Sequence, residues 1–383
     1  MWSPKAIPHS LVDKSCQTAL SRYLDQDLCF LIWFNRLRHI ITLLQLRWFS
    51  MITRRLGQNG PEVAALGIGA MSFSNFYGPT SDQDVFDVMT RAIDLQINHI
   101  DTANLYGAGR SETLIGAFLK AQGKQAEDFF TIATKASIRK ADDGQTVFDN
   151  SLAHLESALD ASLKRLGLEA VDLFYAHRKD QSMEIEEVAD NLATLVKKGK
   201  AKAIGFSEIA PFHLRRAHAV HPVAAIQSEY SLSVRAPELG LVQTAAEIGA
   251  TMVAFSPVGR SLLTDKPYGP DDLADKDFLR INPRFMGANL VANIKATDKL
   301  RVLARDVGMP TAALAIGWLL AQAQHVLPIP GTRSAPHLAE LAKALETPLS
   351  ADILAKIDEI LPVGWAHGDR YSHEQWRGPE RYS

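Results

Sequence analysis

The chain has 383 residues, of which 46% are hydrophobic and 22% charged, and a formal net charge of −2. This composition is typical of a folded globular protein and gives no reason to expect a nucleic-acid partner. The only cysteines, Cys16 and Cys29, lie in the first thirty residues, so the main body offers no disulfide framework and no cysteine-based zinc site. We predict a protein of the reducing cytoplasm.

Residues 1–50 differ in pattern from the rest of the chain. Two apolar runs, 28–34 and 40–49, are separated by a short basic stretch. Neither run reaches the ~20 apolar residues that span a bilayer, and their order fits a signal peptide poorly. One alternative is an amphipathic helix at a membrane surface. We favour an accessory or spurious, dispensable extension, because the sequence from Met51 begins like a complete domain, and we expect a folded body over 51–383.

From about residue 60, short apolar runs rich in β-branched residues alternate with helical stretches. The runs are almost continuously hydrophobic, which is typical of parallel strands buried on both faces. The expected strands are 63–69, 99–103, 129–135, 171–177, 201–207, 224–230, 251–257 and 325–330.

Capping residues and periodicity predict the helices between these strands. The first begins at Ser81, whose hydroxyl can cap it with Asp84 in the first turn, and runs to about Gln96. The others are 111–121, 151–166, 185–198, 211–220, 238–248 and 311–322. The alternation of strands and helices predicts an α/β fold. The number of β–α repeats fits a closed (β/α)8 TIM barrel better than an open sheet.

Polar side chains stand at or just after the ends of three successive expected strands. They are Asp101, Tyr106, Lys135 and His177. Each has an ordinary structural explanation by itself, as a turn residue, a solvated strand end or a satisfied histidine. In a barrel, however, these strand ends meet at one mouth, where active sites of this fold lie.

Together these residue types suggest one kind of chemistry. An ammonium beside a phenol favours the phenolate, so Lys135 should make Tyr106 a better proton donor than an ordinary tyrosine of pKa about 10. The carboxylate of Asp101 would keep the ammonium charged and in place. Such a set suits the protonation of an oxygen while a carbonyl is reduced.

Seven motifs follow one another along the chain: DTANLYGAGRSETLIG, IATK, YAHRKD, GFSEI, IQSEYSL, FSPVGRSLLT and IPGTRS. In this order they resemble the aldo-keto reductases, over about residues 52–362. The resemblance implies an oxidoreductase that reduces an aldehyde or ketone by hydride transfer from a nicotinamide cofactor. It also implies that Tyr106 is the general acid, that Lys135 lowers its pKa with Asp101 as partner, and that His177 orients the carbonyl.

No metal site is predicted. His213, His218 and His221 lie on an expected surface helix and lack the HExxH spacing of a zinc enzyme.

The expected cofactor site differs from a Rossmann site, because LGIGAMSF lacks the third glycine and a ribose-binding acid does not follow. A (β/α)8 barrel instead offers a phosphate site in the loops after its last two strands, here 255–260 and 330–334. Backbone N–H groups around Gly259 and Gly331 can approach phosphate oxygens there, beside a helix N-terminus. The plain alternative for 330–334 is a strand-to-helix turn.

The resemblance extends to individual cofactor contacts. It implies hydrogen bonds from Ser207 and Gln227 to the carboxamide, with Tyr230 or Phe255 against the nicotinamide ring. The other implied cofactor contacts are Met71 and Asp101, then Ser256, Pro257, Gly259 and Arg260 along the pyrophosphate, and Gly331, Thr332, Arg333, His337 and Glu340 around the adenosine.

Two positions depart from the family pattern. Glu208 stands where many relatives have Asn, and Leu341 where an adenine-binding Asn is common. Arg333 can pair with a 2′-phosphate, so we expect NADPH rather than NADH.

The substrate pocket is less defined by the sequence. Phe73, Phe76 and Tyr77 follow the first strand and 178–181 the fourth; aromatic walls suggest a partly apolar aldehyde or ketone, with a polar carbonyl as the alternative. The long segment 261–295 is expected to fold over the cofactor as a flap, or else to be a disordered insertion. The aromatic and charged C-terminal tail, from Trp365 onwards, is expected to reach the barrel mouth.

Two other functions stay open at this point. One is a cofactor-binding regulatory subunit resembling the β subunits of voltage-gated potassium channels. The other is a lyase that uses Lys135 as a Schiff base, although Asp101 should keep that amine charged. The substrate, the favoured direction and the oligomeric state are not fixed by the sequence.

Overall fold

The computed structural model describes residues 52–274 and 276–382, so the predictions for residues 1–50 fall outside the described residues. Among the described residues, no helix combines the length and the hydrophobicity that crossing a membrane requires. The cytoplasmic location stays a prediction.

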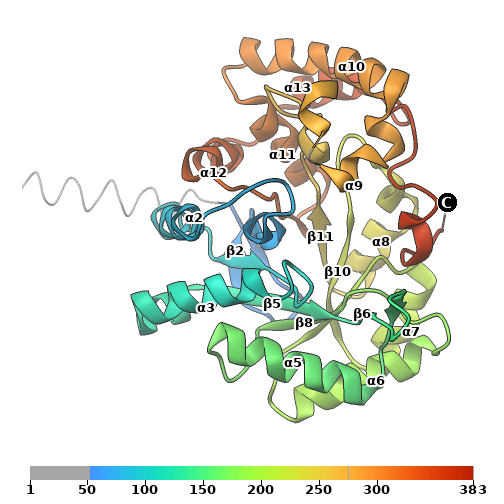
Figure 1. Ribbon diagram of the computed structural model, residues 1–383. Coiled ribbons are helices and arrows are strands. Elements are labelled where there is room, and N and C mark those ends of the chain that lie inside the picture. The colour runs from blue at the N-terminus through green and yellow to red at the C-terminus, as the bar shows by residue number, and fades with distance from the viewer. Residues whose placement is uncertain (1–51, 275, 383) are drawn as a thin grey trace, which may run out of the picture. The chain divides into compact units, whose positions relative to one another are not determined.

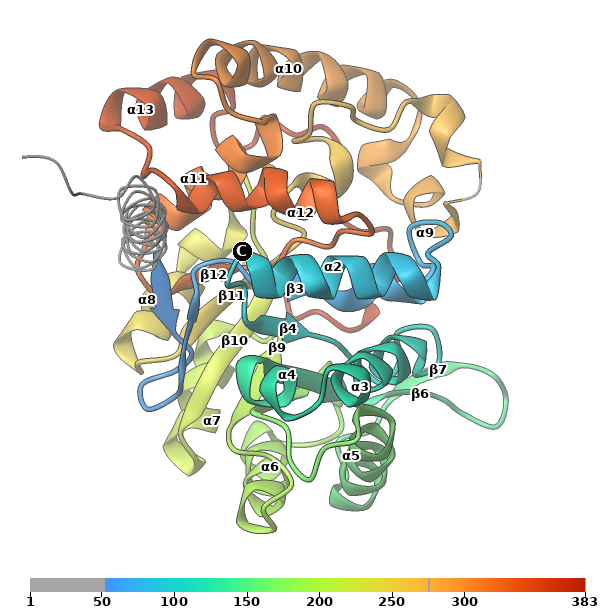
Figure 2. The same ribbon diagram turned by 90° about the vertical axis from the view of Figure 1, so that its left-hand side faces the viewer.

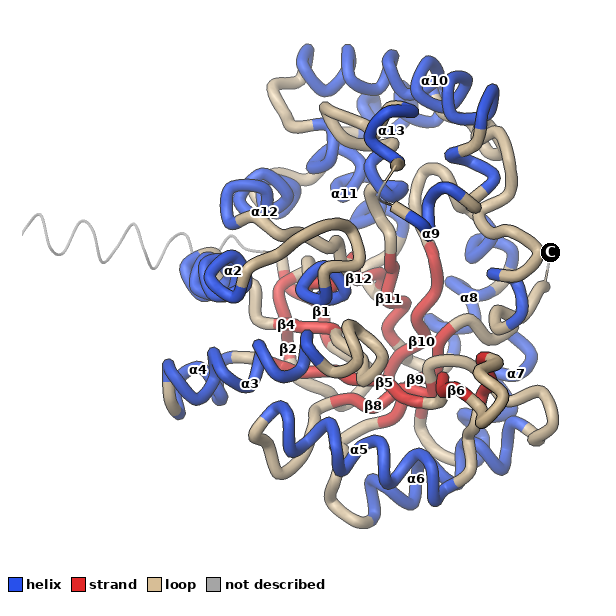
Figure 3. The backbone as a smooth tube through the Cα atoms, in the orientation of Figure 1, coloured by secondary structure: helices blue, strands red, loops and turns tan. Residues whose placement is uncertain are grey.

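Eight parallel strands lie at the centre of the fold and helices surround them (Figures 1 and 3). Within this sheet, each strand pairs with the barrel strand that follows it along the chain. In the observed register, Lys135 lies opposite Tyr175, and Ser207 lies opposite Gln227. The strands are β3 (Ile68–Gly69), β4 (His99–Asp101), β5 (Thr131–Ala136), β8 (Leu173–Ala176), β9 (Ile204–Ser207), β10 (Val223–Glu229), β11 (Thr251–Phe255) and β12 (Val326–Pro328).

Backbone hydrogen bonds between the first and last strands close the barrel. The N–H groups of Gly67 and Gly69 donate to the carbonyls of Pro328 and Pro330, at 2.9 and 3.0 Å. The prolines have no N–H, so they cannot return the bonds of a regular ladder. A Cβ at Gly69 would lie 2.7 Å from the carbonyl oxygen of Ile329, so this close approach requires glycine. The (β/α)8 barrel prediction is confirmed.

Helices pack around the outside of the strands. Figure 2 shows α2, α12 and α11 lying side by side over one part of the barrel. The principal helices are α2 (Asp82–Asp94), α3 (Arg110–Gln122), α4 (Lys124–Phe129), α5 (Leu152–Leu166), α6 (Ile185–Lys197), α7 (Pro211–Val220), α8 (Leu241–Glu247), α9 (Asp277–Arg280), α10 (Gly287–Asp306), α11 (Thr311–Gln322), α12 (Ala335–Ala342) and α13 (Ala351–Ile360).

The predicted cap of the first helix is confirmed. Ser81 and Asp84 form a reciprocal capping box, in which each side chain accepts the other's backbone N–H, at 3.1 and 2.8 Å. This arrangement satisfies two N–H groups that an uncapped helix would leave without partners.

One local prediction was wrong. Residues 63–69 are not one strand, because β2 (Glu62–Ala64) pairs antiparallel with β1 (Thr53–Arg55) and only Ile68–Gly69 joins the barrel. The segment 261–295 contains α9 and the start of α10 in its described part, so it is not the disordered insertion that was the alternative to a flap. Its role as a flap over the cofactor stays a prediction. Its apolar residues bury a separate small core, made by Leu262, Leu273, Leu279, Phe285 and Leu290.

Side chains packed inside the barrel contact the residues at the strand ends. Tyr175 is fully buried there and occupies the space beside Gly205, where a Cβ would come within 2.5 Å of the tyrosine ring. Its ring lies below Lys135, whose Nζ is 5.8 Å from the ring centroid. This packing holds the lysine side chain from beneath.

Candidate active site

Asp101, Tyr106 and Lys135 meet at the C-terminal end of the barrel. Asp101 ends β4, Tyr106 lies in the loop that follows it, and Lys135 lies in β5. The ammonium of Lys135 donates to the Asp101 carboxylate, to the carbonyl of Thr102 at 2.7 Å, and to the Tyr106 hydroxyl at 3.4 Å. All three N–H groups of the ammonium are therefore engaged.

The surroundings of Lys135 keep it charged. Its side chain is fully buried, and burial alone lowers the pKa of an amine. The Asp101 carboxylate and the bonds to Asp101 and Tyr106 outweigh burial, so the pKa of Lys135 is raised above its usual value. The second oxygen of Asp101 accepts a hydrogen bond from the Gln227 amide at 2.8 Å.

The proton of Tyr106 is directed away from Lys135, because the Tyr106 oxygen already accepts the lysine N–H. Burial raises the pKa of Tyr106 above 10, while the charge of Lys135 opposes this rise. The expectation of a lowered pKa is thus corrected: the ammonium acts in the expected direction, but burial of the phenol is the larger effect. The hydroxyl is protonated at neutral pH.

His177 follows β8 directly, and its ring meets that of Tyr106 edge-on with centroids 5.9 Å apart. Burial, followed by the positive charges of Arg178 and Lys135, lowers the pKa of His177 well below 6.5. Its imidazole is therefore neutral at pH 7. Its Nδ1 is buried and has no hydrogen-bond partner among the described residues.

A cavity of about 410 Å³ opens next to this cluster. Most of the residues expected at the site line it: Met71, Asp101, Tyr106, His177, Ser207, Gln227, Phe255, Ser256, Pro257, Arg260 and Gly331. The other expected residues do not border the cavity: Lys135, Gly259, Thr332, Arg333, His337 and Glu340. Lys135 lies beneath Tyr106, whereas His337 and Glu340 are exposed on α12.

Three residues that follow the ends of barrel strands near the cavity have positive φ angles. Glu208, Ser256 and Arg260 have φ values of 59°, 50° and 53°, in the left-handed region that costs energy for residues other than glycine. Such strain concentrates at functional sites, where surrounding contacts enforce it.

The structure separates the two expected candidates for the nicotinamide ring face. Phe255 borders the cavity. Tyr230 is fully buried elsewhere, with its hydroxyl donating to Glu238 at 3.0 Å and its ring 5.9 Å from that of Trp318. Of the two, only Phe255 is available to a ligand in the cavity.

The two arginines assigned to phosphates have different surroundings. Arg260 is buried and forms an ion pair with Glu229 at 2.8 Å, so its charge is already neutralised. Arg333 donates to the carbonyl of Pro79 at 3.0 Å. Because a carbonyl has no net charge, this bond leaves the positive charge of Arg333 for an anion.

Several cavity residues were not predicted individually. Leu105, Ile138, Phe278 and Tyr371 complete an apolar wall together with the expected Phe76 and Tyr77, whereas the expected Phe73 is fully buried and does not border the cavity. Ile138 belongs to an unpredicted hairpin of β6 (Ile138–Lys140) and β7 (Thr146–Phe148).

Phe278 comes from the segment 261–295 and Tyr371 from the C-terminal tail. The prediction that the tail reaches the mouth is therefore confirmed. The aromatic content of both segments was the available signal, but the sequence does not tell which ring faces the cavity.

Comparisons with known proteins agree with this geometry. A sequence model of the "Aldo/keto reductase family" matches residues 65–362. The chain belongs to this family. As an aldo/keto reductase it is an oxidoreductase of carbonyl compounds in general.

Relatives of this aldo/keto reductase match over most of their length. "Aldo-keto reductase yakc [NADP(+)]" of Schizosaccharomyces pombe is 36% identical over 326 residues, which cover 84% of this chain and 95% of the relative. "Probable aldo-keto reductase 1" of Glycine max is 36% identical over 328 residues, with 84% and 94% covered. Among solved structures, a glycerol dehydrogenase of Gluconobacter oxydans is 26% identical with a TM-score of 0.71, covering 81% of this chain and 95% of that one.

Proposed function

We propose that this aldo/keto reductase reduces an aldehyde or ketone to an alcohol, with NADPH as the cofactor and Tyr106 as the proton donor. The observation that carries the proposal is the hydroxyl of Tyr106, which accepts a hydrogen bond from Lys135 and borders the cavity with its own proton uncommitted. A reduced nicotinamide bound in the cavity would supply the hydride for the carbonyl carbon.

Tyr106 donates its proton to the carbonyl oxygen as the hydride arrives, which completes the alcohol. The developing alkoxide is a stronger base than a phenolate, so a tyrosine with a raised pKa still transfers its proton. Lys135 then stabilises the phenolate left behind, because it remains charged and in contact. Asp101 holds the ammonium in position.

His177 serves as a neutral hydrogen-bond donor to the carbonyl oxygen. A proton on Nδ1 would be a buried donor without an acceptor, which is costly. The tautomer with the proton on Nε2 avoids this cost and makes Nε2 the donor. An imidazolium would compete with Tyr106 as the acid, and burial disfavours it.

The cavity residues fit a nicotinamide dinucleotide. Ser207 and Gln227 border the cavity beside Asp101 and can bind the carboxamide, with Phe255 against the ring. Gly331 has no side chain to obstruct a phosphate at the cavity border, where a Cβ would lie 2.4 Å from the hydroxyl of Ser72. Arg333 would bind a 2′-phosphate, in agreement with the NADP(+) in the name of the Schizosaccharomyces relative.

A panel of aldehydes and ketones, followed by the absorbance of the reduced nicotinamide with NADPH and with NADH, tests this proposal. We expect turnover of at least one carbonyl with NADPH. A regulatory subunit without turnover would give none across the panel. A lyase that forms a Schiff base would instead give a substrate adduct on Lys135 that borohydride traps. The positive charge and the three hydrogen bonds of this amine disfavour Schiff-base formation.

A further inference from the structure

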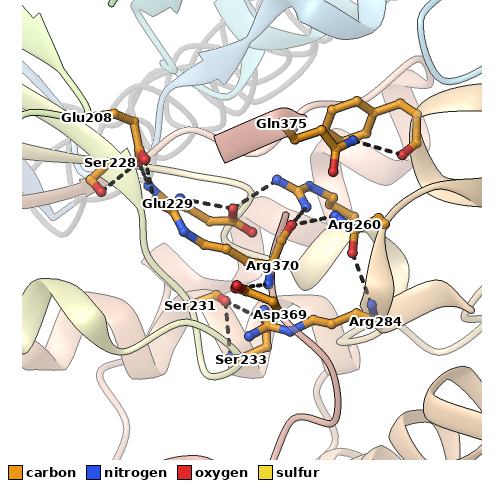
Figure 4. A network of polar contacts seen from close by, with 12 residues as sticks. Glu208, Ser228, Glu229, Ser231, Ser233, Arg260, Arg284, Asp369, Arg370 and Gln375 are labelled. Carbon is orange, nitrogen blue, oxygen red and sulfur yellow. Dashed lines mark hydrogen bonds and ion pairs between the residues drawn. The ribbon is translucent and has the colours of Figure 1, made fainter. Parts of the chain in front are cut away.

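Four buried charged side chains form one network of polar contacts next to the cavity (Figure 4), and one of them, Arg260, borders it. Glu208 and Glu229 are 2% exposed, Arg370 8% and Arg260 9%. Arg370 binds the Glu208 carboxylate and lies 3.3 Å from Glu229, which also accepts a hydrogen bond from Arg260 at 2.8 Å. Two positive and two negative charges make this cluster neutral as a whole. We refer to these four residues as the charge cluster.

The charge cluster holds two aromatic rings of the cavity wall. The guanidinium of Arg260 lies 5.1 Å from the ring centroids of both Phe278 and Tyr371. The guanidinium of Arg370 lies 4.7 Å from the ring of Tyr371. Both rings border the cavity, and so does Arg260 itself. The two guanidinium groups therefore contact the aromatic part of the cavity wall.

Backbone contacts attach the tail at the same point. The carbonyl of Arg370 accepts hydrogen bonds from Arg260, at 3.0 Å, and from the Asn282 amide. Arg260 comes from the loop after β11, Asn282 from the segment 261–295, and Arg370 from the tail. The tail is therefore joined, at the residue before Tyr371, to the part of the chain between β11 and α10.

The charge cluster is also anchored next to the expected nicotinamide contacts. Glu208 directly follows Ser207, and its carboxylate accepts the Ser228 hydroxyl at 2.7 Å and the backbone N–H of Glu229 at 2.9 Å. Ser228 in turn follows Gln227. The charge cluster therefore connects Phe278 and Tyr371 to the strand ends that carry Ser207 and Gln227, next to which hydride transfer would occur.

We propose that the charge cluster positions Phe278 and Tyr371 as a stacking wall for an aromatic carbonyl substrate, with Arg370 as its principal positioning residue. This inference rests on the proposed reductase function. Apolar contacts alone are not directional, whereas an arginine held between two carboxylates has a fixed orientation. Arg260 is accordingly assigned to the substrate wall instead of the pyrophosphate.

The test compares a small and an aromatic aldehyde, propanal and 2-naphthaldehyde, with the full-length enzyme and NADPH. We expect Arg370→Met to raise KM for 2-naphthaldehyde by about 10-fold, the scale of one lost aromatic contact. The KM for propanal should rise less, so that the ratio of the KM for 2-naphthaldehyde to the KM for propanal increases. Tyr371→Ala should have the same effect, and the double variant should add little to either, because both remove one contact.

Glu380→Gln provides a control in the same tail, because the Glu380 carboxylate accepts the backbone N–H of Ala210 and is not part of the charge cluster. The backbone N–H of Glu380, which donates to the Glu208 carbonyl at 2.8 Å, is not altered by the substitution. The ratio of the two KM values should be unchanged. If Arg370→Met does not fold, Glu208→Gln with Arg370→Met removes both charges of one pair and should show the same ratio. Equal losses for both aldehydes, or additive effects of Arg370→Met and Tyr371→Ala, would overturn the inference. Absence of wild-type turnover with every carbonyl would instead overturn the proposed function on which it rests.

Discussion

Glu208→Gln should make the stability of the enzyme less dependent on acid pH. Burial raises the pKa of Glu208, but the charge of Arg370 and its hydrogen bond lower it more, to about 2. A carboxyl with a depressed pKa stabilises the fold above its unfolded pKa of about 4.3, and this stabilisation is lost as the pH falls towards 2.

The size of this effect follows from the shift. A difference of about 2.3 pKa units corresponds to about 3 kcal/mol at neutral pH, of which about 2 kcal/mol is lost by pH 3. The substitution itself leaves Arg370 short of one charged partner, and breaking a buried pair typically costs about 3–5 kcal/mol. Total stabilities of about 5–15 kcal/mol make both effects measurable.

Urea unfolding of wild type and Glu208→Gln at a series of pH values between about 7 and 3 measures the effect. Other carboxylates also titrate in this range, so the decisive quantity is the difference between the two proteins. We expect this difference to shrink as the pH falls, because protonation removes the same charge in wild type. Glu247→Gln, in an exposed pair with Arg215, is the matched control and should behave like wild type. A difference that does not vary with pH would refute the role assigned to Glu208.

Three further outcomes are expected. Arg333→Ala should raise KM for NADPH by about 10- to 100-fold, the scale of a charged hydrogen bond, and leave KM for NADH nearly unchanged; equal effects on both would contradict the 2′-phosphate contact. The kcat/KM for carbonyl reduction should not vary between about pH 7 and pH 9. The pKa of His177 lies well below 6.5, so the histidine is neutral throughout this range, and Tyr106 stays protonated in it. An inflection near pH 6.5 or above that disappears in His177→Gln would show that the histidine titrates there. Lys135→Met should abolish most turnover while NADPH binding, measured by fluorescence, stays near normal; loss of cofactor binding instead would place Lys135 in the cofactor site.

Much of the fold could be predicted because its determinants are local. Each expected apolar run overlaps a barrel strand, and the polar residues at the ends of three of these runs are Asp101, Lys135 and His177. Residues 63–69 were mispredicted because a hairpin and a barrel strand are both apolar there, and only pairing with Thr53–Arg55 distinguishes them.

The cavity wall could not be predicted for a related reason. The contact between Glu208 and Arg370 joins residues 162 positions apart, and no local pattern marks either partner. The pKa of Tyr106 was mispredicted because the order of the strands indicates that the charge of Lys135 lies nearby but does not indicate how deeply the phenol is buried. Arg260 likewise matched a phosphate motif, while its actual partner Glu229 is visible only in three dimensions.

Tyr106→Phe tests the central claim most directly, since it removes one hydroxyl and leaves the ring in place. With NADPH and a carbonyl that wild type reduces, we predict that kcat falls by about 10²- to 10⁴-fold. NADPH binding, measured by fluorescence titration, should stay within a factor of about two, because the hydroxyl is not a cofactor contact in this account. A variant that keeps wild-type kcat would show that the proton comes from another group and would contradict the account.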